Sequence, residues 1–283
     1  MMKNKVCLVT GATAGIGEVT AFKLAQMGAT VVGVGRNPAK CAATESRIRA
    51  ETENPNVEFL VADLSSQAQI RALDASFRQK YHRLDVLVNN AGAFNFAREV
   101  SVDGIEMTFA LNHLGYFLLT HLLLDVLKAS APARIVSVSS SAHYNGKLDL
   151  DDLEMQKNFQ GWPAYANSKL ANVLFTYELA RRLEGTGVTA TVLHPGWVAT
   201  EFAYNNLRGW LGLFRPFYRL FQKMTAITPE QGADTIVYLA TSPEVEGVTG
   251  KFFVERQEKR SLAVSYDEGV AKKLWEISER MVR

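Results

Sequence analysis

Short apolar runs rich in β-branched residues alternate along the chain with longer amphipathic stretches, and glycine or polar turns separate the two. The runs predict strands at Val6–Thr10, Thr30–Val34, Val57–Ala62, Leu84–Val88, Ala133–Val138, Val188–Leu193 and Lys251–Val254. The intervening stretches predict helices, among them one that ends near Met27, Pro38–Thr52 and Gln67–Tyr81. Apolar strands that alternate with helices are typical of a parallel sheet buried on both faces. The pattern therefore predicts an α/β fold, a doubly wound parallel sheet of about seven strands with helices on both faces.

The composition stays uniform along the chain, with no internal repeat, no low-complexity tract and no linker. Residues 1–283 are therefore predicted to form a single domain, a size that α/β folds reach as one unit. Two stretches lack a regular pattern, Ser141–Ala164 and Glu201–Thr228, and each follows a predicted strand. Loops at the carboxyl ends of parallel strands bind ligands in open α/β sheets, so we expect both stretches beside the active site.

Composition narrows the classes of function. Hydrophobic residues make up 47% of the 283 residues, and 31 Lys and Arg against 29 Asp and Glu leave a formal charge of +2. That balance gives no support to nucleic-acid binding, which is typical of strongly basic proteins. Two cysteines, Cys7 and Cys41, form neither a disulfide framework nor a four-ligand zinc site, and we expect no metal. Because no signal-like stretch and no apolar run of about 18 residues occurs, we expect a cytoplasmic protein without a transmembrane segment.

Three glycines occur in the turn after the first strand, Thr10-Gly11-Ala12-Thr13-Ala14-Gly15-Ile16-Gly17. Gly11 permits a tight turn, Gly15 lets the backbone approach a diphosphate, and Gly17 allows close contact between helix and strand. The free N–H groups at the start of the helix attract an anion. The turn predicts a Rossmann-type dinucleotide site with contacts from Gly11, Thr13, Ala14, Gly15, Ile16 and Gly17.

The charge at the end of the second strand predicts which dinucleotide binds. An acidic residue there would bind both ribose hydroxyls of NAD, whereas this chain has Gly35-Arg36-Asn37 and no Asp or Glu between Glu18 and Glu45. An arginine complements a 2′-phosphate. We therefore predict NADP(H), with Arg36 and Asn37 at the phosphate; the alternative is that Arg36 is a solvated surface charge.

Candidate catalytic groups follow. Tyr165 and Lys169 occur four residues apart at the start of a long helical pattern and share one helix face. An ammonium beside a phenol favours the phenolate, which suits a proton donor or acceptor near neutral pH. A serine of the Ser139-Ser140-Ser141 run could hydrogen-bond a substrate carbonyl, and Asn112 could help fix a relay water. His143, which flanks the predicted pocket, is expected at the surface.

Seven motifs occur in a fixed order: the Thr10–Gly17 turn, Asp63-Leu64, Asn89-Asn90-Ala91-Gly92, Asn112, the Ser140 region, Tyr165 with Lys169, and Pro195–Thr200. This arrangement resembles the short-chain dehydrogenase/reductase family from about residue 4 to residue 255. The resemblance implies a catalytic tetrad. In it Tyr165 is the general acid/base, Ser140 polarises the carbonyl, Lys169 binds the nicotinamide ribose and lowers the pKa of the tyrosine, and Asn112 anchors the relay water.

The same resemblance implies further cofactor contacts: Asp63, Leu64, Asn90, Ala91, Gly92, Tyr165, Lys169, Pro195, Gly196, Val198 and Thr200. The run from Ser139 to His143, the run from Tyr165 to Phe175, His194-Pro195-Gly196 and the long insertion between Ser140 and Tyr165 look like the NADP-dependent retinol dehydrogenase branch. Membrane-bound members of that branch carry an N-terminal anchor, and we expect none here. The resemblance also implies that the helix after Tyr165 pairs with its symmetry mate in a homo-oligomer, whereas the residues alone equally permit core burial.

The stretch at about 201–228 combines basic residues with aromatic residues at helical spacing. It is interpreted first as a lid whose apolar face covers a lipophilic substrate. Two alternatives remain: an interfacial helix that contacts an anionic membrane, and a surface that packs against the body of the protein or another subunit. The principal hypothesis is an NADP(H)-dependent oxidoreductase that interconverts a lipophilic alcohol and an aldehyde or ketone. The rivals are a light-driven tetrapyrrole reductase and a non-enzymatic dinucleotide sensor.

Overall fold

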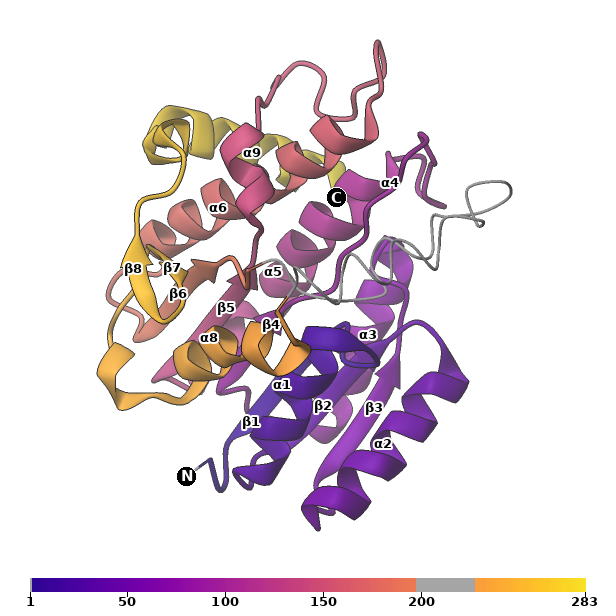
Figure 1. Cartoon of the computed structure of the whole chain (residues 1–283), viewed down its shortest axis with the longest axis vertical. Coiled ribbons are helices and arrows are strands. Elements are labelled where there is room, and N and C mark those ends of the chain that lie inside the picture. The colour runs from indigo at the N-terminus through magenta and orange to yellow at the C-terminus, as the bar shows by residue number, and fades with distance from the viewer. Residues whose placement is uncertain (1, 197–226) are drawn as a thin grey trace.

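Eight strands form one sheet in the computed structural model, which describes residues 2–196 and 227–283 (Figure 1). Their bounds are β1 Val6–Thr10, β2 Thr30–Gly35, β3 Val57–Val61, β4 Val86–Asn89, β5 Ala133–Val138, β6 Val188–Leu193, β7 Lys251–Val254 and β8 Gln257–Lys259. They lie in the order β3-β2-β1-β4-β5-β6-β7-β8, and all neighbours are parallel except β7 and β8. The predicted doubly wound parallel sheet is confirmed. The extra strand, β8, is an exposed edge strand without an apolar residue, which is why the pattern does not indicate it.

Helices cover both faces of the sheet. They are α1 Gly15–Gln26, α2 Pro38–Thr52, α3 Gln67–Lys80, α4 Met107–Phe109, α5 Gly115–Ala129, α6 Gly161–Arg182, α8 Pro229–Thr241 and α9 Glu268–Met281. Shorter turns are η1 Ala110–Leu114, η2 Ser141–Asn145, η5 Pro243–Val245 and η6 Ala263–Tyr266. Local sequence explains several helix starts. The Asn37 side chain caps α2 by accepting from the Lys40 N–H at 2.9 Å, and Thr228 forms a capping box with Gln231 at α8.

Alternate residues of β1 face two separate cores. Leu8 packs in the core that lies beneath α3, α5 and α6, whereas Cys7 and Val9 pack in the core beneath α1, α2 and α8. All three side chains are fully buried. Burial on both faces explains why this strand is apolar at each position from Val6 to Val9 rather than at every second one.

The strand register brings the predicted ligand-binding ends together. Val9 pairs with Val88 in β1 and β4, Asn89 pairs with Ser137 in β4 and β5, and Val138 pairs with Leu193 in β5 and β6. The segments that follow these four strands therefore leave the sheet from one edge. The chain reverses its direction of progress across the sheet at β1, and such a switch point is where open α/β sheets bind ligands.

Two expectations differ from the structure. The irregular stretch Ser141–Ala164 is shorter than predicted, because η2 occupies its start and α6 already begins at Gly161. The pattern indicated no element after Val254, yet α9 buries Ala271, Leu274 and Ser278 at helical spacing. The candidate lid at about 201–228 lies outside the described residues except for Ile227 and Thr228.

One described helix is long and apolar enough to cross a membrane by length and composition alone, residues Met107–Ala129. Of its most apolar window, 72% is buried inside the fold, and core helices of water-soluble proteins pass the same test. This segment forms α4, η1 and α5 and packs against the sheet.

Candidate active site

The glycine turn after β1 has the backbone geometry that the sequence predicts. Gly11 and Gly15 adopt positive φ angles of 67° and 57°, in the left-handed region that favours glycine. A Cβ atom on Gly17 would lie 2.3 Å from the Gly11 carbonyl oxygen, so only glycine permits this approach. Helix α1 starts at Gly15 after Ala14, whose side chain forms no cap. The first N–H groups of α1 therefore stay available to an anion.

Hydrogen bonds from Thr10 and Asn90 join this turn to the loop after β4. The Thr10 hydroxyl donates to the Val88 carbonyl at 3.2 Å and accepts from the N–H groups of Asn90 and Ala91 at 2.8 and 3.0 Å. The Asn90 side-chain amide donates to the Thr10 carbonyl at 2.8 Å. Asn90 thus braces the turn, and Ala91 comes so close that a Cβ atom on Gly11 would lie 2.9 Å from its Cα.

The predicted adenosine-side residues lie at the ends of β2 and β3. Arg36 is exposed and directly follows Gly35. A Cβ atom on Gly35 would lie 2.5 Å from the Thr13 side chain of the glycine turn. The Asn37 side chain serves the α2 cap. The Asp63 carboxylate accepts from the Ser65 N–H and hydroxyl at 2.9 and 2.7 Å. Arg36 is therefore an exposed residue next to Gly35, the residue that lies against the glycine turn.

Pro195 and Gly196 follow β6 at the same edge. The Gly196 N–H donates to His194 Nδ1 at 3.0 Å, and its φ of 91° is in the left-handed region. A Cβ atom there would lie 2.7 Å from Ile227 Cδ1. The predicted contacts Val198 and Thr200 lie outside the described residues.

The structure brings Ser140 and Tyr165 together and separates the roles of neighbouring serines. Ser140 is the second residue after β5, and its hydroxyl hydrogen-bonds the Tyr165 phenol. The buried Ser139 hydroxyl instead donates to the Lys169 carbonyl at 2.8 Å. Ser140 is therefore the serine that faces the tyrosine, as the resemblance implies.

Lys169 lies one turn after Tyr165 on α6 and is 3% exposed. Its Nζ donates to the Val138 carbonyl at 3.2 Å and lies 5.7 Å from the centre of the Tyr165 ring. Burial lowers the pKa of Lys169 to about 7 and raises the pKa of the Tyr165 phenol to about 12, although the Ser140 hydrogen bond opposes the latter shift. In the protein without cofactor, desolvation of the phenol thus outweighs the Ser140 hydrogen bond.

Asn112 is fully buried within the π-helical turn η1. Its side chain exchanges hydrogen bonds with the backbone of Ala93, accepting at 2.8 Å and donating at 2.9 Å, and also donates to the Ser168 hydroxyl at 3.0 Å. A Cβ atom on Gly92 would lie 3.1 Å from Asn112 Oδ1 and 3.4 Å from Lys169 Nζ. Asn112 therefore fixes the loop after β4 against α6, and π turns are common at functional sites.

Sequence reasoning missed an aromatic cluster beside the tyrosine. Phe94 lies 5.7 Å from Tyr165, 4.7 Å from Phe96 and 6.4 Å from Trp162, measured between ring centres. Phe96 is 54% exposed and Trp162 is 51% exposed. We call Phe94, Phe96 and Trp162 the aromatic wall. The sequence could have indicated this cluster, because Phe94 and Phe96 follow the Asn89–Gly92 motif at the carboxyl end of β4, where ligands bind.

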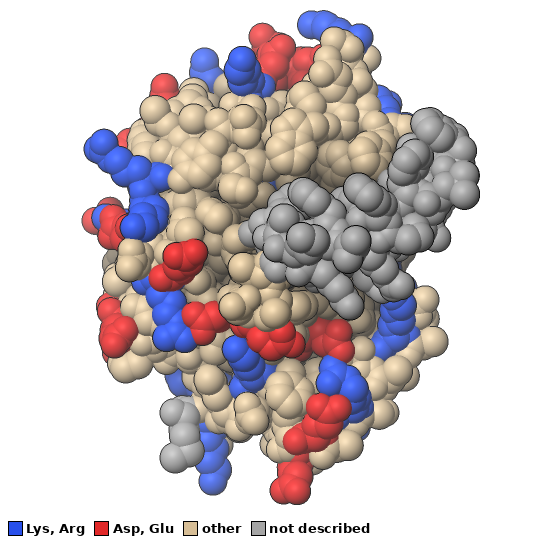
Figure 2. Space-filling model, in the orientation of Figure 1, with Lys and Arg blue, Asp and Glu red and all other residues tan. Residues whose placement is uncertain are grey.

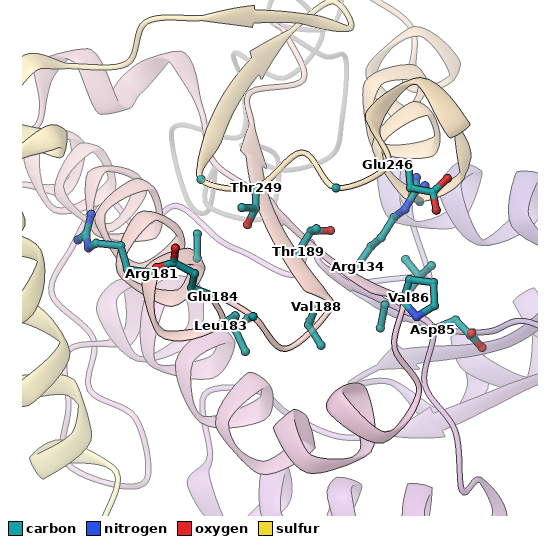
Figure 3. Close-up of a pocket in the computed structure, with 18 of the residues that line it drawn as sticks. Asp85, Val86, Arg134, Arg181, Leu183, Glu184, Val188, Thr189, Glu246 and Thr249 are labelled. Carbon is teal, nitrogen blue, oxygen red and sulfur yellow. The ribbon is translucent and has the colours of Figure 1, made fainter.

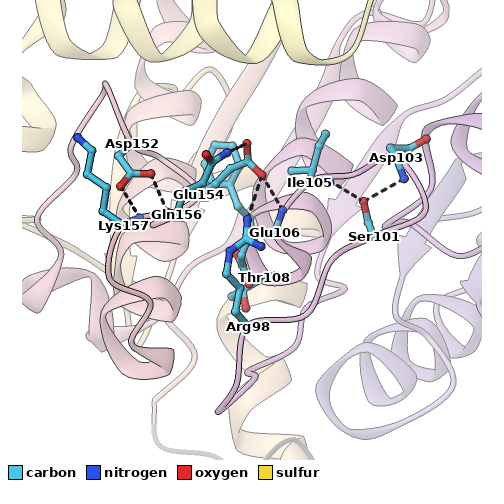
Figure 4. Close-up of polar contacts among 11 residues, drawn as sticks. Arg98, Ser101, Asp103, Ile105, Glu106, Thr108, Asp152, Glu154, Gln156 and Lys157 are labelled. Atoms are coloured by element: carbon cyan, nitrogen blue, oxygen red, sulfur yellow. Dashed lines mark hydrogen bonds and ion pairs between the residues drawn. The ribbon is translucent and has the colours of Figure 1, made fainter.

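Polar contacts join the two loops next to this wall. The Glu154 carboxylate accepts from the Glu106 N–H at 2.9 Å and pairs with Arg98 at 3.8 Å (Figure 4), which joins the long insertion to the loop that carries Phe94 and Phe96. Glu106 in turn caps α4. The first residue of α6 also approaches this loop closely, since a Cβ atom on Gly161 would lie 2.4 Å from the Asn95 carbonyl oxygen.

The expected surface position of His143 is wrong, because the side chain is fully buried. Its Nδ1 lies 2.7 Å from the Ser140 carbonyl oxygen, and its Nε2 accepts from the Leu262 N–H at 3.3 Å. Burial lowers the pKa of His143 to about 4. The imidazole is therefore neutral at pH 7, donates through Nδ1, and holds Ser140 against the segment after β8.

A cavity of about 950 Å³ opens at the amino ends of β4, β5 and β6 (Figure 3). Arg134 extends from its wall and donates to the Leu239 and Ser242 carbonyls, at 3.1 and 2.8 Å. The Asp85 carboxylate accepts from Lys5 at 2.8 Å. The cavity lies at the amino ends of the strands, whereas Ser140 lies beyond the carboxyl end of β5. The cavity and the catalytic candidates are therefore at opposite ends of the strands. No group of potential metal ligands occurs among the described residues.

Comparison with known proteins gives consistent results. A sequence model described as short chain dehydrogenase matches residues 5–209. The chain is 44% identical to Retinol dehydrogenase 14 of Homo sapiens, over all of this chain and 87% of that protein. It is 42% identical to Polyprenol dehydrogenase of Homo sapiens, over 98% and 85%. The solved Pseudomonas aeruginosa RhlG/NADP active-site complex has a TM-score of 0.70 and 28% identity, over 89% of this chain and 94% of that one.

Proposed function

The chain belongs to the short chain dehydrogenase family and is retinol dehydrogenase-like, and from this premise we propose that it is an NADP(H)-dependent oxidoreductase of lipophilic alcohols and carbonyls. Family membership supports an alcohol–aldehyde oxidoreductase that uses a nicotinamide dinucleotide. The hydrogen bond between Ser140 and Tyr165 carries the proposal, because a non-enzymatic sensor has no use for a paired proton donor beside its nucleotide site.

Arg36 supports the choice of NADP(H) over NAD(H). This exposed arginine directly follows β2, whose last residue, Gly35, lies against the glycine turn, and no acidic residue occupies this strand end. A guanidinium forms charge-assisted hydrogen bonds to a phosphate, whereas a ribose diol is bound by a carboxylate. NADP bound to the Pseudomonas aeruginosa relative agrees with this assignment.

The geometry supports a tyrosine acid/base mechanism. When bound, the reduced nicotinamide supplies a hydride to the carbonyl carbon. The Ser140 hydroxyl would donate to the carbonyl oxygen, and Tyr165 would transfer its phenolic proton to that oxygen as the alcohol forms. Lys169 would bind the nicotinamide ribose and stabilise the phenolate that remains. Oxidation of the alcohol runs through the same groups in reverse, with Tyr165 accepting the proton.

The aromatic wall supports a lipophilic substrate. Phe96 and Trp162 expose about half of their surface beside Tyr165, so apolar rings rather than charges flank the proton donor. In Figure 2, an uncharged area occupies the upper centre of the view, with charged side chains along its top and left rim and across the lower half. Two of the relatives are named for retinol and polyprenol, which are apolar alcohols. Burial of an apolar chain against such rings supplies about 25 cal/mol per Å².

An assay of cofactor oxidation at 340 nm with matched aldehydes tests this function. We expect NADPH to be oxidised with retinal and other long apolar aldehydes, and much less with short polar ones. NADH should support a lower rate at equal concentration. Turnover that favours short polar aldehydes would contradict the substrate class, and a preference for NADH would contradict the cofactor. A cytoplasmic location and a homo-oligomer stay proposals from the sequence.

A further inference from the structure

A buried tyrosine that the mechanism does not use lies against the Lys169 ammonium. Tyr116, on the first turn of α5, is fully buried, and its ring centre lies 5.7 Å from Lys169 Nζ, which lies over the ring. The Tyr116 hydroxyl has no hydrogen-bond partner among the described atoms. The contact with Lys169 is thus made by the ring.

The position of Tyr116 is fixed by the close packing of its helix. Residue 115 is a glycine, and a Cβ atom there would lie 2.7 Å from the Leu64 carbonyl oxygen. The Gly115 N–H also donates to the Ala110 carbonyl, which closes the π turn that carries Asn112. The ring of Tyr116 is therefore placed by the same backbone that positions Asn112.

Few other groups stabilise the charge of the Lys169 ammonium. Lys169 Nζ donates to the Val138 carbonyl, and no carboxylate of the described ranges pairs with it. The titratable side chains placed against it are Tyr165 from α6 and Tyr116 from α5, while Asn112 is uncharged. Burial raises the pKa of the Tyr116 phenol well above its usual value, so this side chain stays neutral. A buried cation is stabilised by the negative face of an aromatic ring.

We propose that Tyr116 is a positioning residue that holds the Lys169 ammonium in place and protonated through the face of its ring. The significance of this role rests on the proposed function of Lys169. The two tyrosine rings contact one cation: Tyr165 takes part in the proton transfer, and Tyr116 supports the charge that stabilises the resulting phenolate.

The test is an NMR titration of Lys169 in the full chain labelled with ε-¹³C lysine, with Lys169→Met to identify the signal. Tyr116→Phe keeps the ring and is expected to keep the pKa of Lys169. Tyr116→Leu removes the ring and is expected to lower this pKa by about 0.5 to 1.5 units. The control is Phe117→Leu, which removes an aromatic ring from the next residue. Because Phe117 packs against Trp275, this variant should lower the melting temperature without changing the pKa of Lys169.

Equal pKa values of Lys169 in Tyr116→Phe and Tyr116→Leu would overturn the proposal, whether both stay at the parent value or both fall. If Tyr116→Leu does not fold, increasingly fluorinated phenylalanines at position 116 keep the ring size while weakening its negative face. The pKa should then fall stepwise, and a flat series contradicts the role of the ring. The titration needs neither cofactor nor turnover. A fully active Lys169→Met would instead disprove the proposed catalytic function.

Discussion

The Ser139 hydroxyl donates a 2.8 Å hydrogen bond to the Lys169 carbonyl, which joins the end of β5 to α6. The next side chain along the backbone, Ser140, is directed to Tyr165 instead. Two adjacent serines therefore serve different purposes, one in the fold and one in the proposed reaction.

Exchange of each serine for alanine separates these purposes. Ser139→Ala is expected to lower the free energy of unfolding by about 0.5 to 1.5 kcal/mol, because it removes a buried hydrogen bond to a carbonyl that keeps its helical partner. Ser140→Ala should lower it by about 0.5 to 1 kcal/mol, because the Ser140 hydroxyl also accepts from the Ala142 N–H at 3.2 Å, and should reduce kcat about 100-fold or more. Urea denaturation and steady-state kinetics on both variants measure the two effects. The reverse pattern would assign the catalytic role to Ser139.

Removal of the Tyr165 hydroxyl should abolish proton transfer while keeping the ring. We expect Tyr165→Phe to lower kcat by a factor of about 100 to 10,000. Binding of NADPH, followed by calorimetry, should stay within about threefold of the parent, which corresponds to about 0.7 kcal/mol. Near-normal turnover in Tyr165→Phe would reject the tyrosine mechanism, and lost NADPH binding would show that the variant is not a clean test.

Reversal of the charge at Arg36 should change the cofactor preference. In Arg36→Asp the affinity for NADPH is expected to fall about 10-fold to 100-fold, because a charge-assisted phosphate contact is replaced by repulsion. NADH affinity should hold or rise. The matched control is Lys40→Ala, which removes another exposed positive charge at the start of α2. An equal loss of NADPH affinity in both variants would show a general electrostatic effect instead of a specific contact.

Acid should destabilise the fold through His143. The usual pKa of 6.5 applies to the unfolded chain, whereas burial lowers the folded value to about 4. The neutral imidazole is thus favoured by folding, and its contribution is present above pH 6.5 and lost as pH falls toward 4. Between these values each such histidine reduces the free energy of unfolding by about 1.4 kcal/mol per pH unit. His113, whose pKa burial lowers to about 3, adds in the same direction.

Denaturant titrations at pH 7, 6 and 5 measure this dependence. In His143→Gln the slope of stability against pH should be smaller by about one proton. His82→Gln, the same exchange at an exposed position, is the control. A parent protein whose stability does not change between pH 7 and 5 would contradict the buried, neutral state of both histidines.

A methyl group at Gly161 should disturb the aromatic wall. Gly161→Ala places Cβ 2.4 Å from the Asn95 carbonyl oxygen, so the loop with Phe94 and Phe96 must move. We expect a loss of about 1 to 3 kcal/mol in stability and a higher KM for long apolar aldehydes. Gly269→Ala, at an exposed position near the start of α9, should be neutral or slightly stabilising. A KM for long apolar aldehydes that stays at the parent value in Gly161→Ala would argue against the wall as a substrate surface.

Much of the fold can be inferred from the residues themselves. Runs such as Val6–Thr10 are apolar at nearly every position because both faces of the strand are buried, and such runs by themselves indicate a parallel sheet. The glycine turn is recognisable for a similar reason, since positive φ angles at Gly11 and Gly15 exclude most other residues. In contrast, the exposed strand β8 has no apolar residue and so no pattern.

The residues alone specify the α/β architecture, the phosphate turn and the one-turn spacing of Tyr165 and Lys169, because these depend on local backbone preferences and on spacing along one helix. Packing between distant segments decided which serine faces Tyr165, that Phe94 meets Trp162, and that His143 is buried. It also decided that burial raises the pKa of Tyr165 and lowers that of Lys169. Contacts and desolvation of this kind arise when segments distant in the chain pack together, and no local pattern encodes how much water that packing removes.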